Sequence, residues 1–271
     1  MPNPVLLVIA HGSRDPRHAA TVHALVRRVR SLRPGLRVET GFLDFNIPSV
    51  TGVLESLAAE GVRDVVALPL LLTRAFHAKA DIPAVLREAP PQLRIHQAEV
   101  LGPSPLLLSA LERRLYEAGL TPATAFSRGA TPVPPADNPA WRREIDRMKS
   151  STGVVLASAG STDPEAIAVI AEIAREWRHT GWCAVRPAFA SASLPRTEDA
   201  VRELRALGCA RVAVAPYVLA PGFLPDRIAR GAAEADADVL ADVLGPTPEV
   251  ARVVLERYDE ARVPVLTALG A

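Results

Sequence analysis

The sequence predicts an α/β protein of two similar lobes, each a parallel sheet of about four strands flanked by helices. Two observations predict this fold class. Short apolar runs of β-type composition alternate with segments of helical periodicity. The same series of segments occurs twice along the chain, which indicates an internal duplication. Repeated strand, helix, strand units form parallel sheets with right-handed crossovers and helices on both faces.

The strands of the first repeat are apolar segments separated by helical patterns. They cover Val5–Ala10, Leu36–Leu43, Val65–Leu72 and approximately Arg94–Val100. Because a parallel connection needs a crossover of a dozen or more residues, helices between the strands fit one parallel sheet. The first half of the chain is therefore expected to form such a sheet.

The helix after the first strand has a start signal and an apolar face. Asp15 is followed by Pro16, as expected for an N-cap residue and a proline at the first helical position. Apolar residues then recur at helical spacing, at Val22, Leu25, Val26 and Val29. The spacing predicts a helix that buries this stripe against the sheet.

The duplication consists of matched segments in the same order. "LLVIAHGSRDP" matches "VVLASAGSTDP", "VETGFLDFNIP" matches "VRPAFASASLP", and "VLGPSP" matches "VLGPTP". These pairs begin at Leu6 and Val154, at Val38 and Val185, and at Val100 and Val243. Because the matches are collinear at a nearly constant offset, they indicate two copies of one ancestral half.

The repeats define the expected domain organisation. We expect an N-terminal lobe over residues 1–120 and a C-terminal lobe, a diverged copy, over residues 151–271. Residues 121–150 between them are rich in proline, which predicts a linker or an excursion. Within this segment, Trp141–Lys149 has the apolar spacing of a short amphipathic helix.

Composition excludes several classes of partner. A formal net charge of +1 and an aromatic content of 4% argue against a nucleic-acid partner. No apolar segment is long enough to span a membrane, and no secretory signal precedes the first strand, so we expect a cytoplasmic protein. Cys183 and Cys209 lack C-x-x-C spacing, which excludes a zinc knuckle and a cysteine-bound cluster and favours two small buried side chains.

Three chemically active residues follow strands of the first repeat. His11 comes after the first strand, Asp44 ends the second, and His77 lies just past the third. The carboxyl ends of parallel strands share one edge of the sheet, where ligands bind. Two imidazoles and a carboxylate suit a borderline divalent ion such as Fe²⁺, Co²⁺, Ni²⁺ or Zn²⁺. The absence of a thiolate favours an exchangeable ion over a structural zinc.

Each of these residues also has an ordinary structural interpretation. A histidine at a strand end is more often a hydrogen-bonded structural residue, and aspartate commonly caps turns. The second repeat favours function, because it keeps the glycines, prolines and apolar pattern but loses all three polar residues. The replacements are Ala159 for His11, Ser191 for Asp44 and, if Phe76 aligns with Phe223, Leu224 for His77.

Neighbouring residues are candidates for substrate binding. Gly12 and Ser13 predict a tight strand-to-helix turn whose N–H groups face the ligand edge and suit a carboxylate. Arg14, Arg74 and Lys79 flank the three candidate ligands and suit acidic substituents, although a solvated surface explains them equally well. We expect the remaining histidines to be structural or exposed, namely His18, His23, His96 and His179.

The segments "LLVIAHGSRDP", "GFLDFNIPSV" and "LPLLLTRAFHAKADIP" closely resemble the sirohydrochlorin chelatases of the class II chelatase family, in their long two-lobed form. The resemblance covers essentially the whole chain. It implies insertion of a divalent metal into sirohydrochlorin, a tetrapyrrole with eight carboxylates on the route to sirohaem or cobalamin. His11 and His77 match the family's metal-binding and proton-transfer histidines, and Asp44 falls where many relatives carry glutamate.

The resemblance also bears on cofactors and partners. Cobalt enzymes of this family sometimes carry a histidine-rich or iron–sulfur tail, and this chain has neither, which favours Fe²⁺ with Co²⁺ next. The metal is then a substrate, with no permanently bound cofactor, and the chain is a monomer or a homodimer. Two other functions use the same ligands: a carrier of metal or tetrapyrrole, and a different metalloenzyme with two histidines and one carboxylate.

Overall fold

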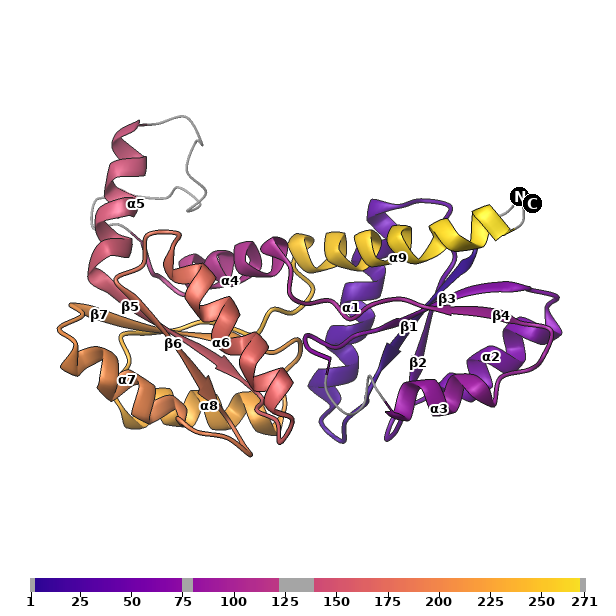
Figure 1. Cartoon of the computed structure of the whole chain (residues 1–271), viewed down its shortest axis with the longest axis horizontal. Helices are drawn as coiled ribbons and strands as arrows, with labels where there is room; N and C mark the ends of the chain where they lie inside the picture. The colour runs from indigo at the N-terminus through magenta and orange to yellow at the C-terminus, as the bar shows by residue number, and fades with distance from the viewer. Residues whose placement is uncertain (1–2, 75–79, 122–138, 269–271) are drawn as a thin grey trace. The chain divides into compact units, whose positions relative to one another are not determined.

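The computed structural model describes residues 3–74, 80–121 and 139–268. It contains two four-stranded parallel sheets with the strand orders β2-β1-β3-β4 and β6-β5-β7-β8 (Figure 1). The identical order in the two sheets reflects the duplication. The predicted fold class is therefore confirmed.

The first sheet contains the predicted strands of the first repeat. They are β1 (Val5–Ala10), β2 (Val38–Phe42), β3 (Asp64–Pro69) and β4 (Arg94–Gln97). Three helices connect them: α1 (Pro16–Leu32), α2 (Val50–Ala59) and α3 (Ile82–Arg87). The buried residues of α1 are the predicted stripe, and the Asp15 side chain caps the helix by accepting from the Arg17 N–H. Both the helix and its start signal are therefore confirmed.

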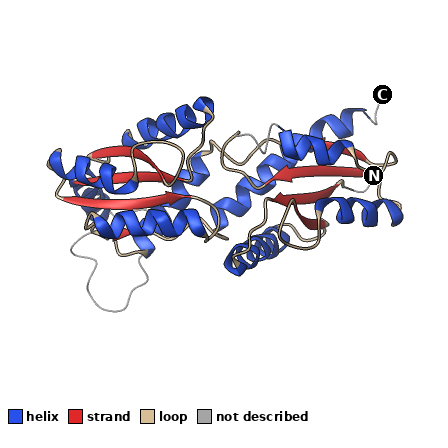
Figure 2. Ribbon diagram, turned by 90° about the horizontal axis from the view of Figure 1, so that it is seen from below, coloured by secondary structure: helices blue, strands red, loops and turns tan. Residues whose placement is uncertain are grey.

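The second sheet repeats this pattern. Its strands are β5 (Thr152–Ser158), β6 (Ala184–Phe189), β7 (Arg211–Tyr217) and β8 (Val239–Leu240), and its connecting helices are α6 (Pro164–Arg178), α7 (Thr197–Ala206) and α8 (Phe223–Glu234). Asp163 caps α6 as Asp15 caps α1. In each unit helices cover both faces of the sheet (Figure 2). Each sheet consequently buries apolar side chains on its two sides.

The described residues contain three further helices: α4 (Pro105–Glu117), α5 (Pro139–Ser151) and α9 (Pro248–Ala268). Helix α5 contains the predicted amphipathic segment, and Met148 on its apolar side is buried. Within the described residues, no helix combines the length and the apolar content that a membrane span needs.

The last helix of each repeat belongs to the compact unit that is formed mainly by the other repeat. One unit comprises residues 1–107, 219–222 and 245–271, and the other comprises 108–218 and 223–244. The predicted lobes followed the order of the repeats, whereas α9, from the second repeat, packs against α1 of the first (Figure 1). Most of α4, from the first repeat, belongs to the second unit.

Polar contacts hold each exchanged helix in place. The Arg257 guanidinium on α9 donates to the carbonyls of Val100, Leu101 and Pro103. The Arg114 guanidinium on α4 donates to the Leu244 carbonyl. These arginines occupy the same position after "VLGPSP" and "VLGPTP". The duplication has therefore preserved one contact in both units.

Candidate metal and substrate site

His11 and Asp44 lie side by side at the carboxyl edge of the first sheet. Strands β1 and β2 are neighbours, and Ala10 pairs with Phe42 in the last register position. The ladder continues one step further, because the Asp44 N–H donates to the His11 carbonyl at 2.9 Å. His11 is half-buried and Asp44 is exposed. The expected meeting of these two residues at one edge is therefore found.

A glycine holds the two loops of this edge together. Gly12 has φ +95°, and a Cβ atom at this position would lie 1.9 Å from the Asp44 carbonyl oxygen. The second repeat has the same arrangement, with Gly160 at φ +90° and 1.9 Å from the Ser191 carbonyl oxygen. Only glycine fits such a close approach at positive φ. A glycine is thus required for packing at this position in both repeats. In the first repeat, Gly12 fixes where Asp44 lies.

Ser13 takes part in the same turn. Its hydroxyl accepts from the Asp15 N–H at 3.1 Å, as the Ser161 hydroxyl accepts from the Asp163 N–H at 3.0 Å. The Ser13 N–H donates to Asn46 Oδ1 at 2.8 Å. One of the N–H groups expected to face a ligand carboxylate is therefore used within the fold.

The Asp44 carboxylate is available at the surface. Oδ1 accepts from the Phe45 N–H at 2.8 Å, which orients the side chain. The second oxygen has no hydrogen bond within the described part of the chain. A carboxylate held by one oxygen and exposed at the other suits a role as a metal ligand.

Phe45 is a further candidate for this site that the sequence analysis did not single out. It has φ 60° and is 50% exposed. Its ring centroid lies 6.5 Å from that of His11, and the Arg14 guanidinium lies over the ring at 5.2 Å. Ile47, two residues on, is 87% exposed. The signal was present, since "DFNIP" places two large apolar residues in a strand-to-helix loop, where polar residues are usual.

The remaining candidates are less directly connected to this edge. His77 and Lys79 lie outside the described residues. Arg74 forms an ion pair with Glu99 at 3.5 Å, with both side chains more than half exposed. Among residues 3–74, 80–121 and 139–268, no group of three histidine, cysteine or acidic side chains is placed to hold a metal ion.

His18 on α1 lies within the electrostatic reach of His11. Burial lowers the pKa of His18, and a positive charge on His11 lowers it further. Its Nδ1 is buried without a hydrogen-bond partner in the described part of the chain. His18 therefore favours the neutral form.

Comparisons with known proteins identify relatives along most of the chain. A sirohydrochlorin cobaltochelatase of Priestia megaterium is 27% identical over 227 residues, which cover 82% of this chain and 66% of the relative. A sirohydrochlorin ferrochelatase of the same organism is 25% identical over 248 residues, which cover 89% of this chain and 84% of the relative. These names agree with the resemblance that the sequence motifs indicate.

A solved structure shares the fold. SirB from Bacillus subtilis with Fe³⁺ superposes with a TM-score of 0.77 at 23% identity and covers 98% of both chains. The CbiX family model matches residues 5–118 and 153–261, which include both repeats. This chain therefore belongs to the CbiX family.

Proposed function

We propose that this chain is a sirohydrochlorin chelatase that inserts a divalent metal, preferably Fe²⁺ and otherwise Co²⁺, into sirohydrochlorin. The observation that carries the proposal is the match of both repeats to the CbiX family, with His11 and Asp44 adjacent at the ligand edge of the first. Curated relatives are named for insertion of either metal, so the family match alone does not favour one.

His11, Asp44 and His77 are proposed to hold the metal before transfer. Imidazole nitrogens and a carboxylate oxygen bind borderline divalent ions well, and without a thiolate the complex remains exchangeable. Exchange is necessary because the metal is a substrate that leaves with the product. The exposed Asp44 oxygen supports this role, since an ion reaching the edge from solvent meets it without rearrangement of the loop.

Insertion releases two protons from the macrocycle. Two pyrrole N–H groups each lose a proton as the metal forms bonds to the nitrogens, so a base must lie beside the metal. Histidine titrates near neutral pH, and an imidazole that the departing metal releases is a suitable acceptor. His11 and His77 are the proposed bases. Placement of the macrocycle against the metal supplies much of the remaining acceleration.

The surroundings of His11 suit a planar, acidic ligand. Phe45 and Ile47 present apolar surface beside His11, and large exposed apolar residues of this kind commonly mark binding surfaces. The Arg14 guanidinium over the Phe45 ring adds a positive charge at the border of that surface. We propose that the ring of sirohydrochlorin lies on these apolar residues and that its carboxylates meet Arg14, with Arg74 and Lys79 as further candidates.

The choice of iron rests on the sequence. The 271-residue sequence contains no histidine-rich run and no closely spaced cysteines, features that the resemblance links to some cobalt enzymes. We propose that the enzyme works in the cytoplasm, without a permanently bound cofactor and without a nucleic-acid partner.

Anaerobic mixing of the chain with sirohydrochlorin and either Fe²⁺ or Co²⁺, followed by absorbance, tests the proposal. We expect multiple turnovers, faster with Fe²⁺. Asp44→Asn should lower kcat/KM at least about tenfold, whereas Asp242→Asn, an exposed carboxylate of the second repeat, should leave it unchanged. A carrier would give only a stoichiometric change, and another kind of metalloenzyme would give none. Either result would reject the proposal.

A further inference from the structure

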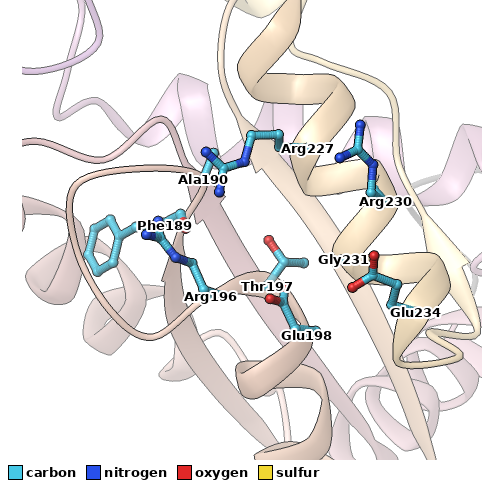
Figure 3. Close-up of a pocket in the computed structure, with 9 residues that line it drawn as sticks. All are labelled: Phe189, Ala190, Arg196, Thr197, Glu198, Arg227, Arg230, Gly231 and Glu234. Atoms are coloured by element: carbon cyan, nitrogen blue, oxygen red, sulfur yellow. Dashed lines mark hydrogen bonds between the residues drawn. The ribbon is translucent and has the colours of Figure 1, made fainter.

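The second repeat contains a pocket of its own at the end of β6. Its volume is about 140 Å³, and it lies between the first turn of α7 and one face of α8 (Figure 3). Arg227, Arg230 and Glu234 line it at the three- and four-residue spacing of a single helix face. The volume accommodates a group of a few heavy atoms with its bound water.

The pocket contains three guanidinium groups: Arg196, Arg227 and Arg230. Within the described residues, none of them has a carboxylate oxygen within 4.0 Å. By contrast, Arg186 and Arg205 of the same unit are paired with Glu203 and Asp238. The Arg196 guanidinium donates a weak hydrogen bond to the Phe189 carbonyl at 3.4 Å, and the Arg196 backbone N–H donates to Asp199 Oδ2 at 3.2 Å. The three guanidinium groups therefore lie in the pocket without a direct ion pair to any described residue, although two carboxylates, Glu198 and Glu234, also line it.

Thr197 points into the same space. It is only 2% exposed, yet no hydrogen bond of its hydroxyl is found among the described residues. Figure 3 shows this hydroxyl on the side of the pocket that faces Arg227. Because the rest of the residue is buried, this hydroxyl is reached through the pocket, where it can bond to a ligand or a bound water.

Comparison of the repeats shows that one of these arginines, Arg196, stands where the first repeat has a helix-capping serine. The match of Pro48 with Pro195 aligns Ser49 with Arg196, the N-cap position of α2 and of α7 respectively. The Ser49 hydroxyl caps its helix by accepting from the Gly52 N–H. Arginine is a poor residue for this position because it places a positive charge at the positive end of the helix dipole. A local rule broken in one repeat and kept in the other points to function.

We propose that this pocket binds one carboxylate group of an acidic ligand. Arginine forks match carboxylates in bidentate geometry, and the Thr197 hydroxyl supplies a further donor. Glu198 and Glu234 also line the pocket, so with the three arginines its formal charge is +1. That balance suits a monoanionic carboxylate better than a phosphate dianion. The ligand is either a side chain of sirohydrochlorin, which rests on the proposed function, or a free small dicarboxylate.

Two measurements test this site. Calorimetric titration with succinate, and separately with inorganic phosphate, probes the pocket without any chelatase activity. Steady-state kinetics with sirohydrochlorin probes the substrate. The variants are Arg227→Gln and the near-isosteric Thr197→Val, with Arg178→Gln, an exposed arginine of α6, as control. Thermal unfolding of each variant establishes that it folds.

If the ligand is sirohydrochlorin, Arg227→Gln should raise KM for sirohydrochlorin about tenfold with kcat nearly unchanged. Thr197→Val should also raise KM, and Arg178→Gln should change neither constant. If the ligand is free, succinate should bind the parent chain and lose about tenfold in affinity in Arg227→Gln, while KM stays constant. Unchanged KM together with absent succinate binding would overturn the site. Tighter binding of phosphate than of succinate would overturn the assignment to a carboxylate. Absence of turnover by the parent chain would reject the chelatase proposal and leave the succinate measurement valid.

Discussion

Replacement of Gly12 by alanine tests how the fold positions Asp44. A Cβ atom there would lie 1.9 Å from the Asp44 carbonyl oxygen, so the β2–α2 loop must move. Positive φ costs alanine about 1–2 kcal/mol, and displacement of packed structure costs about 1–3 kcal/mol. The expected loss in the free energy of unfolding is therefore about 2–5 kcal/mol.

Two matched glycines separate these contributions. Gly61 has φ +80° and nothing within 4 Å of an added Cβ, so Gly61→Ala should cost only the strain of about 1–2 kcal/mol. Gly160→Ala repeats both terms in the second repeat and should match the loss of Gly12→Ala. Of the three variants, only Gly12→Ala should also weaken Co²⁺ binding, because only it displaces Asp44. Urea unfolding and metal titration give the two readings. Equal losses for Gly12→Ala and Gly61→Ala would refute the close approach, and unaltered Co²⁺ affinity in Gly12→Ala would refute its role in the site.

Three further outcomes follow from single side chains. Arg257→Met should cost about 2 kcal/mol in urea unfolding, since it leaves loop carbonyls without donors; an unchanged midpoint would contradict the described anchoring of α9. Phe45→Ala should raise KM for sirohydrochlorin with little loss of stability, whereas Leu207→Ala, 54% exposed on the other unit, should change neither; equal kinetic effects of the two would remove Phe45 from the site. Burial raises the pKa of the Cys209 thiol to about 11, so the folded chain keeps a proton that the unfolded chain releases. Under reducing conditions, stability should accordingly be fully present below about pH 8.5 and fall as pH rises toward 11. Cys209→Ala should flatten this fall, and an identical slope in both proteins would contradict it.

Local patterns predicted local structure accurately. The first strand has the predicted bounds, Val5–Ala10, because an uninterrupted apolar run between polar segments determines a buried strand. The later strands end earlier than predicted, at Phe42, Pro69 and Gln97. Single hydrogen bonds to the neighbouring strand continue past these ends, from the N–H groups of Leu43, Leu70 and Ala98. The point at which the chain leaves the regular ladder depends on the loop that follows, and the apolar run alone does not show it.

Long-range packing was the part that the sequence did not reveal. Nothing in the composition of α9 says that it packs on the first repeat, because its apolar face suits either sheet. Cys183 and Cys209 were expected to be small buried side chains; Cys209 is buried, Cys183 is half-buried, and their Sγ atoms lie 3.7 Å apart. Gly153 leaves room for them, since a Cβ there would lie 2.8 Å from Cys209 Sγ. Such a contact joins segments that only the folded sheet brings together.

The candidate site was likewise predicted in part. His11 and Asp44 were predicted to meet because strand ends share an edge, a rule of topology that needs no coordinates. Phe45 was not predicted because a single apolar residue in a loop does not by itself indicate a site. Its positive φ and its contacts with His11 and Arg14 are visible only in the structure. The pocket around Arg196 was missed because its residues come from two helices whose approach depends on Gly231.

We propose that the edge of the first repeat binds the metal through His11. Titration of the chain with Co²⁺ under anaerobic conditions, without tetrapyrrole and followed by its visible d–d absorption, tests this most directly. We predict saturation at a single ion per chain, loss of the bands in His11→Ala, and their retention in His179→Ala, an exposed histidine of the second repeat. Undiminished Co²⁺ bands and affinity in His11→Ala would contradict the assignment of the metal to this edge.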